Sequence, residues 1–105
     1  MKSYKFQVLV TVLRAGNGAP CMKLGPSPCR VVVRARNDET LRNQVYGALI
    51  SSYDDRAFRP GSPRVIATLR VTGDDVCDYL HIGSHFHLWA GGDVGEGVVT
   101  RRLFV

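Results

Sequence analysis

The 105-residue sequence lacks several features that define common protein classes. No apolar run approaches the roughly 20 residues of a membrane-spanning helix, so no membrane partner is expected. The first residues contain no apolar block followed by a cleavage site, so we expect no signal peptide and a cytoplasmic protein. A content of 45 % hydrophobic and 22 % charged residues excludes a disordered tail, a collagen and a coiled coil. We therefore expect one folded domain over residues 1–105.

Cysteine is scarce and is odd in number. The three cysteines are Cys21, Cys29 and Cys77. An odd count without an export signal argues against a disulfide framework, although the sequence leaves open whether Cys21 and Cys29 pair.

Signatures of catalysis are also lacking. The segment Gly91–Gly97 is glycine-rich, but it has neither the Lys-Ser/Thr end nor the following helix of a phosphate-binding loop. We therefore expect no nucleotide hydrolysis and interpret the segment as a wide hairpin turn. No nucleophile elbow is present. The carboxylate pairs Asp54-Asp55 and Asp74-Asp75 are interpreted as solvated loop residues. The sequence thus predicts no catalytic residue.

The histidines are the remaining candidates for metal chemistry. His85 and His87 lie two residues apart, so on a strand they share a face and could touch one ion, with Asp78 as a further ligand. No third ligand has a clear place, however. We favour surface residues that contact a partner, together with Trp89, and we expect no metal and no cofactor.

Apolar and polar residues alternate along most of the chain, which predicts β-strands. Strands are expected over residues 3–14, 30–36, 64–72, 85–90 and 98–105, with residues 73–83 as a connection. Residues 37–53 are ambiguous, because Leu41, Val45 and Leu49 recur at helical spacing while Gly47 suits a bulged strand. A strand is favoured there. Six or so strands separated by Gly and Pro predict an all-β barrel or sandwich.

Positive charge is concentrated in the first half of the chain. Residues 1–53 hold eight basic and two acidic side chains, a net charge of +6, whereas residues 54–105 hold six and seven, a net charge of −1. On the predicted strands, several arginines point away from the core: Arg30, Arg34, Arg36, Arg64 and Arg70. Arginine forks bind phosphate and carboxylate groups, so a nucleic acid or an acidic protein is the expected kind of partner.

The C-terminal sequence HFHLWAGGDVGEGVV (residues 85–99) resembles a known pattern. The third domain of elongation factor Tu closes with Arg-Phe-x-Ile-Arg-Glu, followed by Gly-Gly-x-x-Val-Gly-x-Gly-Val-Val. YKFQVLV (residues 4–10) is similar to the opening strand of that domain. Gly-Pro-Ser-Pro at residues 25–28 and Phe-Arg-Pro-Gly at residues 58–61 resemble two of its turns. The resemblance spans nearly the whole chain.

This resemblance implies a six-stranded antiparallel β-barrel. In elongation factor Tu the barrel packs on the GTPase domain, contacts the T stem of aminoacyl-tRNA and meets the nucleotide-exchange factor. Carried over by residue, it implies that Gly91 and Gly92 approach an RNA backbone and that Arg70 matches a basic residue. The chain departs from the family in a shorter hairpin, in Asp93 at a basic position, and in having no GTPase domain.

Three functions are therefore weighed. The favoured one is a stand-alone binding module without catalytic activity, which binds a tRNA-like RNA or a translation-associated protein. The alternative is a protein-only interaction, immunity or regulatory protein that mimics the surface of a translation factor. A small metal-dependent enzyme is the least favoured. The sequence leaves the oligomeric state open.

Overall fold

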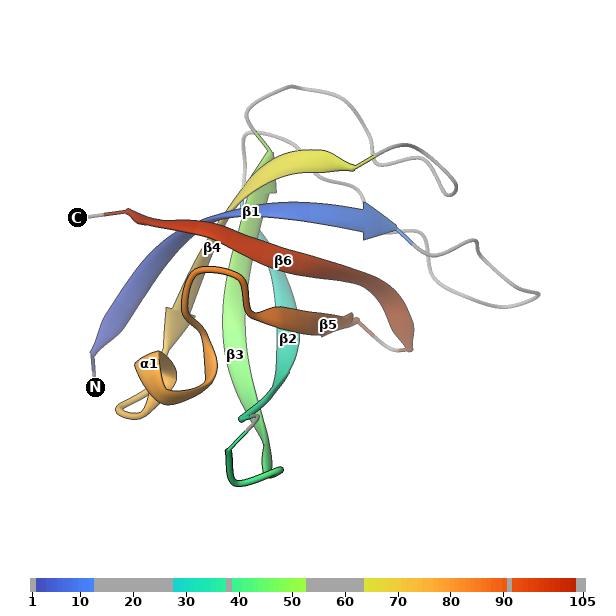
Figure 1. Ribbon diagram of the computed structural model, residues 1–105. Coiled ribbons are helices and arrows are strands. Elements are labelled where there is room, and N and C mark those ends of the chain that lie inside the picture. Colours follow the sequence, from blue (N-terminus) through green and yellow to red (C-terminus); the bar gives the residue numbers. More distant parts are fainter. Residues whose placement is uncertain (1, 13–27, 38, 53–63, 91, 104–105) are drawn as a thin grey trace.

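The computed structural model describes residues 2–12, 28–37, 39–52, 64–90 and 92–103. Over these residues the chain forms a closed barrel of six antiparallel strands and one helical turn (Figure 1). The elements are β1 (Ser3–Val12), β2 (Cys29–Arg36), β3 (Asn43–Ser52), β4 (Val65–Thr72), α1 (Val76–Tyr79), β5 (His85–Trp89) and β6 (Asp93–Leu103). The predicted six-stranded antiparallel β-barrel is confirmed, as is the strand interpretation of residues 43–52.

The strands follow the order β1-β4-β3-β2-β5-β6 around the barrel, and β6 closes it by pairing with β1. In the described residues each of the six strands therefore has a paired strand on both sides, which removes the exposed edges of an open sheet. Along most of the strands, inward-facing buried residues alternate with outward-facing ones, and the buried residues include Phe6, Val8 and Val10 on β1, Val31, Val33 and Ala35 on β2, and Phe86 and Leu88 on β5. The residues between them therefore form the outer surface, as the alternation predicted.

The glycine-rich segment is mostly strand, so its interpretation as a wide turn was wrong. β6 begins at Asp93, five residues earlier than predicted, and only residues 90–92 connect it to β5. Gly97 pairs with Phe86, and a Cβ at Gly97 would lie 2.6 Å from Cζ of that ring and 2.8 Å from the carbonyl oxygen of Leu9. Gly97 therefore leaves space for the ring of Phe86 in the core. The glycine content of a segment does not show whether its glycines serve such packing or form a turn.

The connection after β4 contains the short helix α1, which the sequence analysis did not predict. The Tyr46 hydroxyl donates a hydrogen bond to Oδ1 of Asp75 at 2.9 Å, and the Gln44 amide donates to Oδ2 at 3.2 Å. The Asn37 amide donates to the carbonyl oxygen of Asp78 at 3.0 Å. Burial, followed by the hydrogen bond and charge of Asp75, raises the pKa of Tyr46 well above its usual range. These bonds fasten the segment to β3 and to the β2–β3 hairpin.

Candidate functional site

Outward-facing residues of neighbouring strands form a positively charged row across the barrel. Arg30 on β2 pairs with Leu49 on β3, Leu49 pairs with Arg70 on β4, and Arg70 pairs with Lys5 on β1. Paired residues on antiparallel strands lie about 4.5–5.5 Å apart at Cα. The row therefore brings two arginines and a lysine from distant parts of the sequence onto one surface.

A second row lies beside the first and is uncharged. Trp89 on β5 pairs with Val32 on β2, and Val32 pairs with Gly47 on β3. The Trp89 side chain is 50 % exposed. A Cβ built at Gly47 would meet no atom within 4 Å, so the surface is open at this position. The two rows thus place the exposed Trp89 indole and the open position at Gly47 beside the row that carries three cationic side chains.

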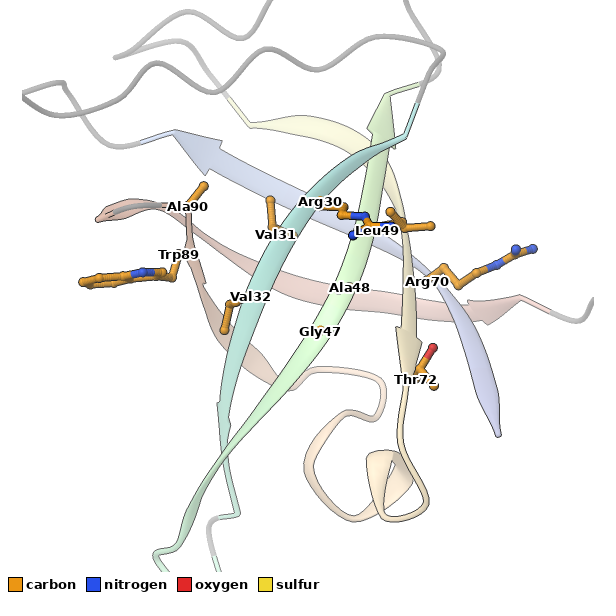
Figure 2. Close-up of a pocket in the computed structure, with 10 residues that line it drawn as sticks. All are labelled: Arg30, Val31, Val32, Gly47, Ala48, Leu49, Arg70, Thr72, Trp89 and Ala90. Carbon is orange, nitrogen blue, oxygen red and sulfur yellow. The ribbon is translucent and has the colours of Figure 1, made fainter. Parts of the chain in front are cut away.

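These rows enclose an open groove of about 590 Å³. The groove is lined by Arg30, Val31, Val32, Gly47, Ala48, Leu49, Arg70, Thr72, Trp89 and Ala90. Figure 2 shows Trp89 and Arg70 at opposite ends of the groove, with Gly47 on the strand between them. A smaller concavity continues past Leu49 and Arg70 to Lys5 on β1. Within the described ranges, no lining residue of either concavity is a carboxylate.

The first five strands carry no acidic residue, whereas β6 brings Asp93 into register with Trp89 and Glu96 into register with His87. In the described part of the chain the acidic residues lie on the β2–β3 turn, on the segment around α1 and on β6: Glu39, Asp74, Asp75, Asp78, Asp93 and Glu96. The surface of the first five strands is therefore positive, and such a surface attracts anionic partners.

A third concavity, which we call the histidine pocket, has a volume of about 490 Å³. It is lined by Arg34, Arg36, Asn43, His81, Gly83, Ser84, His85 and His87. Between it and the groove lies a patch formed by Val32, Arg34, Val45, His87 and Trp89. The patch joins the groove and the histidine pocket into one outer surface that runs along β2 and β5.

The structure separates the predicted partner-binding residues into two groups. Arg30, Arg70 and Trp89 line the groove, whereas Arg34, Arg36, His85 and His87 line the histidine pocket. Arg64 is exposed just before β4 and lines neither the groove nor the histidine pocket. Gly92 is half-buried and accepts the N–H of Ala90 at 3.0 Å. Gly91 lies outside the described residues, so the predicted RNA contact of this turn stays a prediction.

Several lining residues were not singled out from the sequence. Lys5, Gly47 and Leu49 join the arginines only through the pairing of four strands. His81 and Ser84 precede β5 in a loop and reach the pocket because that loop turns back. Alternation placed Lys5 on an outer face, but it carries no information about which strands are neighbours.

The sequence raised two further possibilities, a metal site and a pair of cysteines. Across these ranges, no group of three or more His, Cys, Asp or Glu side chains converges as a set of metal ligands. Cys29 is half-buried at the start of β2 and Cys77 is exposed on α1, whereas Cys21 lies outside the described residues. Over the same part of the chain, no helix has the length and apolarity that a membrane crossing requires.

Comparison with known proteins found no matching family model and no matching curated protein. The resemblance to the third domain of elongation factor Tu therefore stays a prediction from the sequence motifs alone.

Proposed function

We propose that this protein is a non-catalytic binding module, and that the groove binds RNA. The observation that carries the proposal is the composition of the groove. An exposed tryptophan, a glycine with open space above it and two arginines line one groove, and none of the residues that line the groove is a carboxylate. Single-stranded and looped RNA is recognised by stacking of its bases on aromatic side chains and by cationic contacts to its phosphates.

Each part of the groove has a role in this proposal. In this proposal Trp89 stacks on an unpaired base at one end of the groove, and the open space at Gly47 admits the RNA strand between the tryptophan and the charged row. Arg30 and Arg70 lie two strands apart, about 10 Å by the usual strand spacing, and contact separate phosphates of the same RNA strand. Lys5 extends the charged row onto β1. None of these contacts makes or breaks a covalent bond.

We propose tRNA as the RNA and translation in the cytoplasm as the setting. The support is the motif resemblance to the third domain of elongation factor Tu, in which the barrel contacts aminoacyl-tRNA. In this proposal the main contact is made by Trp89, Arg30 and Arg70, which line the groove between β2, β3, β4 and β5. The turn at Gly91 and Gly92 is an additional contact in this proposal.

The test is the salt dependence of tRNA binding. Three phosphate contacts predict an affinity loss of about 20-fold between about 50 mM and about 200 mM salt. An Arg30→Gln/Arg70→Gln variant should bind more weakly and show a shallower dependence, because it releases fewer counterions. Arg64→Gln/Arg101→Gln removes the same charge from exposed positions outside the groove and should behave as wild type.

A flat salt dependence in the wild-type protein contradicts the proposal. Recovery of one protein and no RNA in a pull-down would favour the alternative, a protein-only interaction or immunity module that mimics a translation factor. The exposed apolar side chains of Val45 and Trp89 are the feature that favours this alternative, because such residues are common in protein interfaces.

A further inference from the structure

The histidine pocket brings together five side chains that carry or can gain positive charge. Arg34 pairs with His87 across β2 and β5, and the next pair along the same two strands is Ala35 with Phe86. Arg36 and His85 therefore lie on the following rung and on the same outer face as Arg34 and His87. All four side chains are exposed, so they are accessible to a ligand from solvent.

The fifth group, His81, is held in place by a tight turn. Ser84 N–H donates to the carbonyl oxygen of His81 at 2.8 Å, and Gly83 has a φ of 90°, as the third residue of a type II turn requires. The His81 N–H donates to Oγ of Ser84 at 3.0 Å, and the Gly83 N–H donates to the carbonyl oxygen of Val99 on β6 at 2.8 Å. The turn is thus fixed at one wall of the pocket.

The other polar groups of the pocket suit an anion. Asn43, the partner of Arg36 on β3, adds an amide that can donate, and the Ser84 hydroxyl keeps its own hydrogen for donation. Among the described residues that line the pocket, none is acidic. A site composed of hydrogen-bond donors and cations binds oxyanions, and arginine forks are suited to phosphate.

The charged groups near the pocket include some outside its lining. Glu96 on β6 is the cross-strand partner of His87 and is exposed. Glu39 and Arg42 lie in the hairpin turn between Arg36 and Asn43, and Asp78 lies on α1. These carboxylates reduce the positive potential from outside, but the two arginines keep the pocket cationic over the whole range in which histidine titrates.

We propose that the histidine pocket binds a phosphate-class oxyanion. Arg34 and Arg36 supply two permanent charges on neighbouring rungs of β2. The imidazole rings of His81, His85 and His87, the Asn43 amide and the Ser84 hydroxyl add groups that can donate hydrogen bonds to the same anion. The pocket shares no lining residue with the groove, so this inference does not depend on the proposed RNA function.

The test uses sulfate, a dianion that resembles phosphate in shape. Sulfate is titrated at neutral pH and constant ionic strength and is followed by backbone amide NMR shifts. Binding should saturate, with the largest shifts in residues 34–36 and 81–87. Absence of saturable binding, or shifts centred elsewhere, overturns the proposal.

Two double variants locate the bound anion. Arg34→Gln/Arg36→Gln should weaken sulfate binding roughly tenfold. Arg30→Gln/Arg70→Gln removes the same charge from the groove and should bind sulfate as the wild type does. Full affinity in Arg34→Gln/Arg36→Gln contradicts the proposal, whatever the outcome of the tRNA experiment.

A further arm distinguishes the source of the phosphate. A short RNA with a 5′-phosphate is compared with the same RNA carrying a 5′-hydroxyl. If the ligand is a terminal phosphate, the phosphorylated RNA binds more tightly at neutral pH, where this phosphate carries close to two charges, and the Arg34→Gln/Arg36→Gln variant loses the difference. If the ligand is free phosphate, the two RNAs bind alike and inorganic phosphate binds alone. Failure of sulfate, phosphate and phosphorylated RNA to bind contradicts both forms.

Discussion

The ring of Phe86 fills the space into which a side chain at Gly97 would extend. These residues are cross-strand partners on β5 and β6, and a Cβ at Gly97 would lie 2.6 Å from Cζ of the ring. Phe86 is almost completely buried in the core. The position therefore requires glycine for packing and is not available as a flexible contact to a partner.

Gly97→Ala should destabilise the protein by about 1–3 kcal/mol, because the methyl group overlaps the ring and the Leu9 carbonyl oxygen, which belongs to the backbone of β1. Denaturant unfolding followed by circular dichroism measures the effect. Gly47→Ala is the matched control, since the added Cβ meets no atom within 4 Å. Its stability should stay within about 0.5 kcal/mol of wild type. Equal effects of the two substitutions would contradict this assignment.

Filling the groove at Gly47 should impair binding without impairing the fold. Gly47→Val places a branched side chain on the open floor, where valine also suits a strand better than glycine does. We expect thermal stability at or above that of wild type and an affinity for tRNA that falls in the order Gly, Ala, Val. Fluorescence anisotropy of labelled tRNA measures the series. An unchanged affinity for the valine variant would place the RNA elsewhere.

The raised pKa of Tyr46 makes the free energy of unfolding fall at alkaline pH. Because the pKa of Tyr46 is raised in the folded state, mainly by burial, the native protein holds this proton more tightly than the unfolded chain. The resulting stabilisation is complete below the ordinary tyrosine value of about 10 and is lost as the pH rises above it.

Tyr46→Phe should cost about 1 kcal/mol at neutral pH through loss of the hydrogen bond. It should also lose less stability than wild type between about pH 9 and about pH 11, the range around the ordinary tyrosine value. Urea unfolding across this range checks both effects. Tyr79→Phe, which changes the neighbouring ring, is the control for general alkaline effects. Parallel pH profiles for Tyr46→Phe and wild type would contradict the argument.

Leu41 adopts a backbone conformation that leucine rarely takes. Its φ is 57°, its side chain is 62 % exposed, and its N–H donates to the Asn37 carbonyl oxygen at 2.8 Å. Left-handed backbone costs an L-residue about 1–2 kcal/mol, and asparagine tolerates it better. Leu41→Asn should therefore raise the unfolding free energy by about 0.5–1 kcal/mol, whereas Leu41→Ala should not. Differential scanning calorimetry distinguishes the two, and a lower melting temperature for Leu41→Asn would refute the expectation.

Most of the fold was predictable because alternation reports directly which face of a strand is buried. The inward positions of Val31, Val33 and Ala35 and the outward positions of the neighbouring arginines follow from it. The start of β6 was not predictable in this way. A glycine that packs opposite Phe86 in the core cannot be distinguished in the sequence from a glycine that forms a turn. The helical turn α1 was missed because one turn is too short to show a period.

The candidate site was predictable only in part. Outward exposure of Arg30, Arg70 and Trp89 follows from alternation, but their shared groove follows from the strand order β4-β3-β2-β5, which no local pattern encodes. Gly47 illustrates the same limit. In the sequence it suggested a bulge, whereas in the barrel it is the open floor between the tryptophan and the charged row.

Trp89 is the only tryptophan in the chain, so its fluorescence reports directly on the groove. The decisive measurement is a titration of the protein with tRNA, followed by the emission of this residue. We expect saturable quenching as a base stacks on the indole, with a midpoint that shifts to higher tRNA concentration in Arg30→Gln/Arg70→Gln. Emission that stays unchanged while anisotropy reports bound tRNA would contradict the claim that the groove is where RNA binds.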